Sequence, residues 1–202
     1  MSQPVSVLIV FYSKYGTTRD VAHAIAEGVE STGANAVLRQ LPDVATVIDE
    51  LKPAIPSEGE LYASPDDLNH CDALALGSPG RFGNMAAPVK YFLEQTNTQW
   101  MNGTLAGKPA CCFTATGTLH GGHEATILSM MLPLFHQGMV LMGLPYSIDE
   151  LTHTQHGGTP YGAGRVTGMG HDQPFHSDER KLAVAQGKRL AEFAQQLKRG
   201  EA

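Results

Sequence analysis

The chain alternates between short apolar runs and amphipathic helical stripes, and this alternation constrains its fold more than any other feature. Short, nearly continuous apolar runs are typical of strands that are buried on both faces of a parallel sheet. Five such runs lie along the sequence, at residues 5–11, 35–41, 73–78, 109–116 and 139–145. The sequence therefore predicts five strands, each followed by a segment long enough to cross back over the sheet.

Helical spacing of apolar residues fills most of the gaps between these runs. The stripe at 18–32 places three apolar side chains on one helical face, those of Val21, Ile25 and Val29. Thr17 and Asp20 resemble a capping box at its start, and Gly33 provides a stop. Further stripes lie at 89–96, 127–135 and 178–198. The repeated βα unit predicts an α/β fold, in which helices cover both faces of a five-stranded parallel sheet.

Two stretches do not fit the repeat. Residues 42–70 are interrupted by prolines, and residues 147–177 are rich in glycine with few apolar anchors. Both are long for connections inside a compact domain, so each is either a variable surface excursion or a wall of a ligand site or subunit interface. We expect residues 1–202 to form a single domain with these two excursions, and the GAGRVTG stretch at 162–168 to be a mobile loop.

Composition narrows the function. The formal charge is -6 and no basic run occurs, which argues against nucleic-acid binding and against anionic membranes. No apolar stretch approaches the roughly 18 residues of a spanning helix, so we expect no membrane insertion. Three cysteines, Cys71, Cys111 and Cys112, give no disulfide framework and suit the reducing cytoplasm. Cys111 and Cys112 are adjacent in a predicted strand and should face opposite sides of the sheet.

Ligands of open parallel sheets bind beyond the carboxyl ends of the strands, where three polar loops are expected. These loops read SKYGTT (13–18), SPGRFGN (78–84) and ATGTLHGGHE (115–124). In the first, Ser13, Thr17 and Thr18 offer hydroxyl groups beside the free N–H groups of a helix start. Such an arrangement binds anions, above all phosphate. An ordinary capped strand-to-helix turn uses the same residue types and remains an alternative.

The type of phosphate ligand can be narrowed by elimination. The G-x-x-x-x-G-K-[ST] motif is absent, and no G-x-G-x-x-G follows the first strand, which argues against Walker-type and Rossmann sites. FMN fits, because its phosphate suits the first loop and its flat ring suits the glycines of the other two. Phe82 and Trp100 are candidate stacking surfaces, although each could be an ordinary core aromatic.

His120, His123 and Glu124 lack the further ligand of a zinc site, so we expect no metal. No nucleophile elbow occurs either, so we assign no catalytic side chain.

Several longer motifs match one family over nearly the whole chain: SKYGTT, GSPGRFGNM (77–85), FLEQTNTQWMNGTLAGKP (92–109), TGTLHGGHE (116–124), HQGMVLMGLPY (136–146) and GGTPYGAG (157–164). On these motifs the chain resembles the WrbA family of flavodoxin-like NAD(P)H:quinone oxidoreductases. The resemblance implies a flavodoxin-like fold, an FMN cofactor, and NADH or NADPH as hydride donor. It also implies two-electron reduction of a quinone in a ping-pong sequence, by a homotetramer whose active sites lie where subunits meet.

The resemblance also assigns residues by position. The FMN phosphate would be held by Ser13, Lys14, Tyr15, Gly16, Thr17 and Thr18. The FMN ring would lie along Gly80, Arg81 and Phe82, with its other edge along Ala115, Thr116, Gly117, Thr118, Leu119, His120 and Gly121. His136 would also contact FMN. Tyr15 would help to seat the nicotinamide, and Trp100 would line the quinone pocket.

Three positions depart from the family pattern. Gly80 stands where a threonine is usual, which removes a hydroxyl near the flavin and is expected to loosen the loop. Leu119 alters a loop that is shorter or more polar in some relatives. Pro133 removes a helical hydrogen bond shortly before His136 and should kink the helix there. Two rival functions remain, a flavodoxin-type electron carrier without quinone reductase activity and a binding module that holds no flavin.

Overall fold

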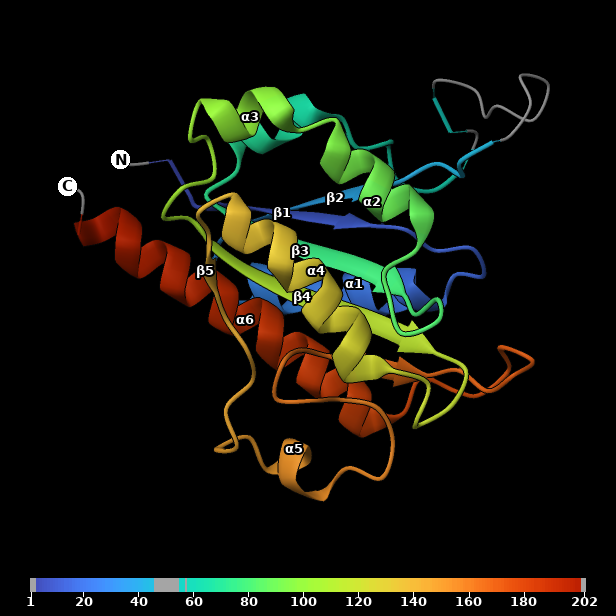
Figure 1. Cartoon of the computed structure of the whole chain (residues 1–202). Helices are drawn as coiled ribbons and strands as arrows, with labels where there is room; N and C mark the ends of the chain where they lie inside the picture. The colour runs from blue at the N-terminus through green and yellow to red at the C-terminus, as the bar shows by residue number, and fades with distance from the viewer. Residues whose placement is uncertain (1–2, 46–54, 57, 201–202) are drawn as a thin grey trace.

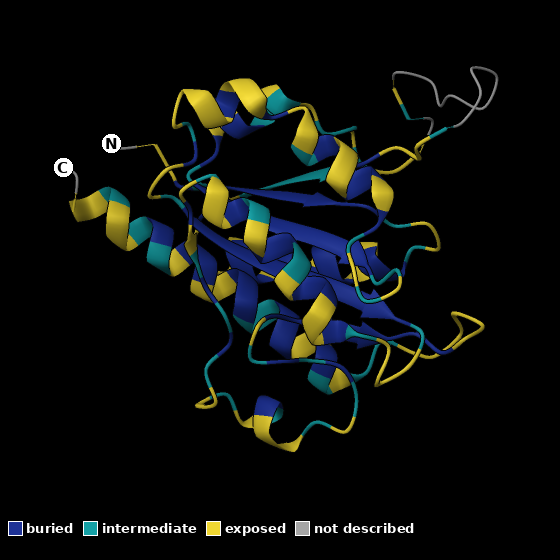
Figure 2. Ribbon diagram, viewed as in Figure 1, coloured by how far each residue is buried: buried dark blue, intermediate teal, exposed yellow. Residues whose placement is uncertain are grey.

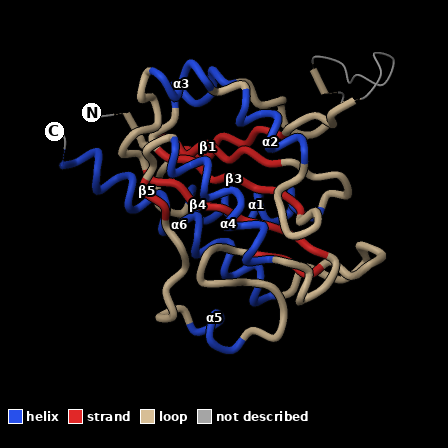
Figure 3. The backbone as a smooth tube through the Cα atoms, viewed as in Figure 1, coloured by secondary structure: helices blue, strands red, loops and turns tan. Residues whose placement is uncertain are grey.

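The computed structural model describes residues 3–45, 55–56 and 58–200. Figures 1 and 3 show a twisted sheet in the middle of the molecule with helices on both sides. The strands are β1 (Ser6–Phe11), β2 (Asn35–Gln40), β3 (Ala73–Pro79), β4 (Pro109–Thr116), β5 (Val140–Leu141) and β6 (Gly164–Val166). The helices are α1 (Thr17–Glu30), the 3₁₀ helix η2 (Pro65–His70), α2 (Ala87–Glu94), α3 (Asn97–Met101), α4 (His123–His136), α5 (Asp149–His153) and α6 (Ser177–Gly200).

All strand pairs of the sheet are parallel, and the strand order is β2-β1-β3-β4-β5. The chain leaves β1 to form β2 on one side and then returns to form β3 on the other. The strand order therefore reverses between β1 and β3, and ligand sites of parallel sheets lie beyond the carboxyl ends of such a pair. The predicted five-stranded parallel α/β fold is confirmed.

The fifth position of the sheet differs from the prediction. β5 is only Val140–Leu141 and pairs with the start of β4, whereas β6 pairs with the end of β4, from Thr114 to Thr116. The strand predicted at 139–145 is therefore too long, and the mobile loop predicted at 162–168 contains a buried strand. The glycines of this segment led to the prediction of a loop, but they are needed for close packing of the strand. A Cβ on Gly164 would lie 2.2 Å from Nδ1 of His123.

Two hydrophobic cores lie on opposite faces of the sheet (Figure 2). Helices α1 and α6 cover one core, which contains Val7, Ile9 and Phe11 of β1. Helices α2 and α4 cover the other, which contains Leu8 and Val10. This alternation follows from the period of two residues along a strand.

The two adjacent cysteines of β4 face opposite cores, as predicted, with Cys111 in the first core and Cys112 in the second. Burial raises the pKa of the Cys111 thiol to about 12 and raises the pKa of Cys112 well above its ordinary value. Burial also raises the pKa of Cys71 to about 11. All three thiols are buried and none forms a disulfide.

The two predicted excursions leave the sheet at different places. The second leaves after β5, carries α5, and packs Leu144 and Leu151 on Leu182 of α6 before it returns as β6. In the first, Tyr62 forms a bridge with Gln40 beside β2, while residues 46–54 and 57 lie outside the described residues. None of the helices in the described ranges is long and apolar enough to cross a bilayer.

Candidate functional site

The loop after β1 forms the start of α1 without a side-chain cap. Gly16 is the N-cap residue and has a φ of 83°, in the left-handed region that glycine adopts freely. Because the N-cap residue is Gly16 and not Thr17, the predicted capping box between Thr17 and Asp20 is wrong. The N–H of Arg19 donates instead to Oγ of Ser13 at 3.2 Å. The backbone N–H groups of Thr17 and Thr18 have no acceptor among the described residues, and they lie at the positive end of a 14-residue helix.

Thr18 lines a small cavity of about 30 Å³ at this helix end. Its side chain is fully buried, and its Oγ1 has no hydrogen-bond partner among the described residues. A buried hydroxyl without a partner is costly, so a polar ligand is the natural occupant of this cavity. We call this cavity the phosphate pit, and its lining residues are Lys14, Tyr15, Thr17, Thr18, Pro79, Gly80, Arg81, Ala115, Thr116, Gly117, Thr167 and His171.

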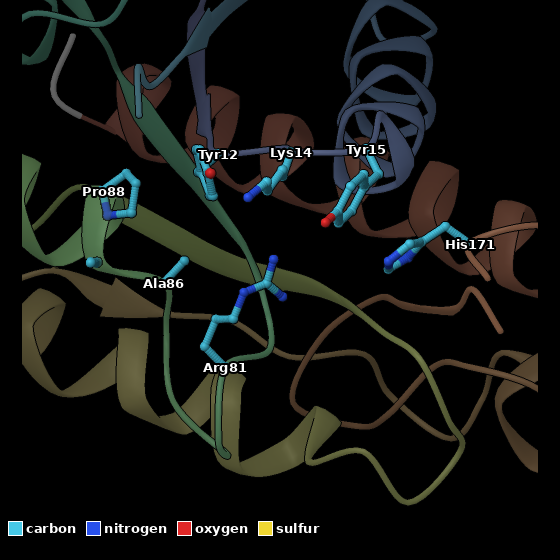
Figure 4. A pocket seen from close by; sticks show the side chains of 8 residues that line it. Tyr12, Lys14, Tyr15, Arg81, Ala86, Pro88 and His171 are labelled. Carbon is cyan, nitrogen blue, oxygen red and sulfur yellow. The ribbon is translucent and has the colours of Figure 1, made fainter. Parts of the chain in front are cut away.

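A larger cavity of about 540 Å³ lies next to the phosphate pit (Figure 4). Four residues line both cavities, and these are Lys14, Tyr15, Arg81 and His171. Tyr12, Ala86, Ala87 and Pro88 complete the lining of the larger one. Within the described ranges, neither Lys14 nor Arg81 takes part in an ion pair. The two cavities together offer an anion site that opens into a space large enough for a flat ring.

Ser78, at the end of β3, shapes one wall of the site. Its Oγ accepts the N–H of Ala86 at 2.8 Å and donates to the carbonyl oxygen of Pro79 at 2.9 Å. Arg81 and Asn84 are joined by a pair of backbone hydrogen bonds that closes a tight turn. Phe82, at the tip of this turn, has a φ of 53°, is fully exposed and lines neither cavity. The contact of Phe82 with the FMN ring therefore stays a prediction, and within one chain the side chain lies outside both cavities.

The end of β4 and the first turn of α4 pack closely against Gly80. A Cβ on Gly80 would lie 2.8 Å from Cγ2 of Thr116 and 3.0 Å from Oγ1 of Thr126. The space that a side chain would occupy is thus already filled, and a threonine would not fit without a shift of its neighbours. The expectation that glycine loosens this loop is not supported. Beyond Gly117, the predicted contacts Thr118, Leu119, His120 and Gly121 are exposed and line neither cavity.

Three polar lining residues, Tyr12, Thr167 and His171, were not predicted from the sequence. The hydroxyl of Tyr12 donates to Asp43 at 2.7 Å, and burial together with this carboxylate raises the pKa of Tyr12. Thr167 and His171 belong to the loop after β6, and the His171 ring stacks on the Tyr15 ring with centroids 4.1 Å apart. Of these three residues, only Tyr12 could have been found from the sequence, because it directly follows an apolar run that predicts a buried strand.

Trp100 and His136 lie together but away from both cavities. Nε1 of Trp100 donates to the carbonyl oxygen of His136 at 2.8 Å, and both residues line a separate surface cavity of about 430 Å³. His136 is the last residue of α4, and the loop after β4 leads into the first residue of that helix. The length of the helix therefore keeps His136 about 20 Å from that loop. Helix α4 runs through Pro133 to His136. Of the predicted phosphate residues, Lys14, Tyr15, Thr17 and Thr18 line the pit, whereas Ser13 and Gly16 do not. Trp100 and His136 do not lie with them in one chain.

The sheet order, the phosphate pit and the adjoining cavity define a flavodoxin-like α/β protein with a site beyond the carboxyl ends of β1, β3 and β4. The model of the NADPH-dependent FMN reductase family matches residues 6–153, and the chain belongs to this family. The chain is 42% identical over 208 residues to a protein of Syntrophobacter fumaroxidans named NAD(P)H dehydrogenase (quinone). A protein of Geobacter sulfurreducens with the same name is also 42% identical. The alignments cover 96% of this chain and 100% and 99% of those relatives.

Solved structures support the same fold. A WrbA-like flavodoxin from Agrobacterium tumefaciens superposes with a TM-score of 0.66 at 22% identity, over 95% of this chain and 98% of that one. A flavodoxin from the domain Archaea gives a TM-score of 0.62 at 18% identity, over 95% of this chain and 99% of that one. The resemblance to the WrbA family that the motifs indicated is confirmed.

Proposed function

We propose that this chain is an FMN-dependent NAD(P)H:quinone oxidoreductase. One observation carries the proposal, namely the buried Thr18 hydroxyl without a partner in a pit that opens into a ring-sized cavity. The relatives of 42% identity that are named NAD(P)H dehydrogenase (quinone) support it, because the chain matches them over their whole length.

The residues of the phosphate pit suit the monophosphate of FMN. The hydroxyl groups of Thr17 and Thr18 and their backbone N–H groups would bind its oxygens at the positive end of α1. The ring would lie in the larger cavity between Lys14 and Tyr15 on one side and Arg81 on the other (Figure 4). When bound, FMN supplies the two-electron chemistry, from NADH or NADPH to a quinone. Tyr15 is half exposed beside this space and would help to seat the nicotinamide.

The same open side of the cavity would receive the nicotinamide donor and the quinone in turn, which predicts a ping-pong order. Trp100 and His136 would reach this side from a second copy of the chain, within a homotetramer. The outer face of α4 supports an interface between copies, because Leu128, Leu132 and Phe135 are all exposed there. A cytoplasmic location would suit the three buried free thiols.

The purified chain tests the proposal directly. A yellow protein that oxidises NADH or NADPH only after benzoquinone is added would support it. Bound flavin without any quinone-dependent consumption of the donor would instead identify a flavodoxin-type electron carrier. A colourless protein that cannot be loaded with FMN would rule out both functions.

A further inference from the structure

Arg165 of β6 is the one lysine or arginine that is buried, among the residues that the structure describes. Its Nη1 atom donates to Oδ2 of Asp20 at 2.5 Å, and its Nη2 atom donates to the carbonyl oxygen of Gln173 at 3.0 Å. The guanidinium also lies 5.1 Å from the centre of the Phe175 ring. A single side chain of β6 therefore contacts both the first turn of α1 and the segment that precedes α6.

Stability alone does not account for an arginine at this place. Removing a cation from water is costly, and a buried ion pair seldom stabilises a fold more than apolar side chains of similar volume would. Nε of Arg165 is moreover buried without a partner among the described residues. Asp20 is half exposed, so water can hydrate its carboxylate without any arginine. The contacts of Arg165 are therefore better explained by what they hold in place.

The two hydrogen-bond partners of Arg165 belong to two walls of the phosphate pit. Asp20 lies in the first turn of α1, whose opening residues line the pit. Gln173 ends a loop, residues 167–173, and two residues of this loop also line the pit. The N–H of Gln173 donates to the carbonyl oxygen of Thr167 at 3.0 Å, which closes the loop at its base. Arg165 thus fastens loop 167–173 to the helix start that would bind the phosphate.

Few other contacts hold this loop to the rest of the chain. Residues 169–174 are exposed, so burial of apolar surface does not fix their position. At the tip His171 stacks on Tyr15, and at the base the N–H of Thr167 continues the pairing with the end of β4. Without the guanidinium, the second half of the loop keeps only the stack, and water gains access to the pit. Hydrogen bonds to a phosphate are weaker where water is not excluded.

The pairing with Arg165 also neutralises an acidic side chain near the proposed phosphate site. Asp20 is the acidic residue of the first turn of α1, at the helix end where the phosphate would bind. Left unpaired, its carboxylate would repel a phosphate that carries roughly two negative charges. Arg165 removes this repulsion without touching the ligand, since it lines neither cavity.

We propose that Arg165 is a positioning residue of the phosphate pit. It holds loop 167–173 against the start of α1 and neutralises Asp20, and it thereby favours a flavin with a phosphate over a flavin without one. This inference rests on the proposed function, because it takes FMN to be the ligand. Arg165→Met keeps an apolar stem beside Phe175 but removes both hydrogen bonds. Because Asp20 is half exposed, this variant leaves no buried charge behind and should fold.

Riboflavin, which lacks the phosphate, separates the effect on the phosphate from binding of the ring. The full chain, freed of flavin, is titrated with FMN and with riboflavin by flavin fluorescence, and thermal unfolding shows whether each variant is folded. The ratio of FMN affinity to riboflavin affinity should fall by about tenfold in Arg165→Met. Arg165→Gln keeps a hydrogen-bond donor but no charge, and its ratio should fall less. Part of the loss should return in the double variant Asp20→Asn/Arg165→Met, because the unpaired carboxylate is then gone.

Arg180→Met is the matched control, because Arg180 also pairs with a carboxylate of α1, that of Glu27, but is exposed and lines neither cavity. It should leave the ratio unchanged. An unchanged ratio in a folded Arg165 variant, or an equal loss for both flavins, would overturn the role of Arg165 while FMN binding itself stands. A lower ratio in the double variant than in Arg165→Met would do the same, because Asp20 would then itself support the phosphate. A wild-type chain that binds neither flavin would overturn the proposed function instead.

Discussion

The carboxylate of Glu179, at the start of α6, accepts the N–H of Val166 in β6 through its Oε1 atom at 2.7 Å. Glu179 is fully buried. Its oxygens also accept the N–H groups of Gly157 at 2.9 Å and of His176 at 3.0 Å. One carboxylate thus joins the second excursion, the end of β6 and the start of α6.

Glu179→Ala should lower the free energy of unfolding by about 3 kcal/mol, because three backbone N–H groups lose a charged acceptor. Urea denaturation followed by circular dichroism measures the loss. The exposed Glu192 on the same helix is the matched control, and Glu192→Ala should change stability by no more than about 0.5 kcal/mol. Equal losses in the two variants would show that the buried carboxylate does not stabilise the excursion.

Thr18→Val should separate cofactor binding from stability. The Thr18 hydroxyl has no described partner, so its replacement by an isosteric methyl group should not destabilise the fold. The affinity for FMN should fall by about tenfold, because the phosphate loses a hydrogen bond. The affinity for riboflavin should stay the same. Thr18→Ser keeps the hydroxyl and should bind FMN normally. A stability loss in Thr18→Val without any change in FMN affinity would contradict the placement of the phosphate.

His123 should make stability depend on pH. Both ring nitrogens are buried without a described partner, and burial lowers the pKa of His123. The unfolded chain then binds more protons than the folded chain below about pH 6.5. Stability should therefore be fully present above that pH and decline as the pH falls, by up to about 1.4 kcal/mol per pH unit from this residue.

His123→Leu should remove this part of the decline, measured as the difference in unfolding free energy between wild type and variant at several pH values. The exposed His153 provides the comparison, since His153→Gln should leave the slope unchanged. A constant difference between wild type and His123→Leu across the acidic range would mean that His123 is not kept neutral in the fold.

Trp100→Ala should reduce quinone turnover more than FMN retention. Trp100 is half exposed and lies far from the phosphate pit of its own chain, so its loss should leave FMN affinity unchanged. We expect kcat/KM for benzoquinone to fall by about tenfold, as for the loss of one stacking contact. Met101→Ala alters a neighbouring exposed side chain and should have little effect. Loss of FMN with otherwise intact quinone kinetics would show that Trp100 does not line the quinone pocket.

The sequence was sufficient to predict most of the sheet and the part of the phosphate pit that the loop after β1 and the start of α1 form. The strands β1, β3 and β4 are apolar runs buried on both faces, and such runs are recognisable without any tertiary information. Thr17 and Thr18 were predictable because a strand followed by small polar residues and a helix brings N–H groups and hydroxyls together locally.

Contacts between distant parts of the chain could not be predicted in the same way. β6 has three residues, and Gly164 and Arg165 give it no apolar pattern, so only its pairing with β4 makes it a strand. His171 joins the site through a stack with Tyr15, 156 positions earlier, and no local pattern encodes that approach. Likewise, the length of α4 keeps Trp100 and His136 away from the pit, although their motifs suggested one site.

The burial of the three cysteines has a consequence for an enzyme of this kind. Quinones are electrophiles that add readily to thiolates, so a quinone reductase is exposed to covalent damage by its own substrate. In this chain Cys71, Cys111 and Cys112 lie inside the cores, and burial raises the pKa of each thiol. At neutral pH they present almost no thiolate, and each residue is at least 96% buried. The fold thereby protects itself from arylation at sulfur during turnover.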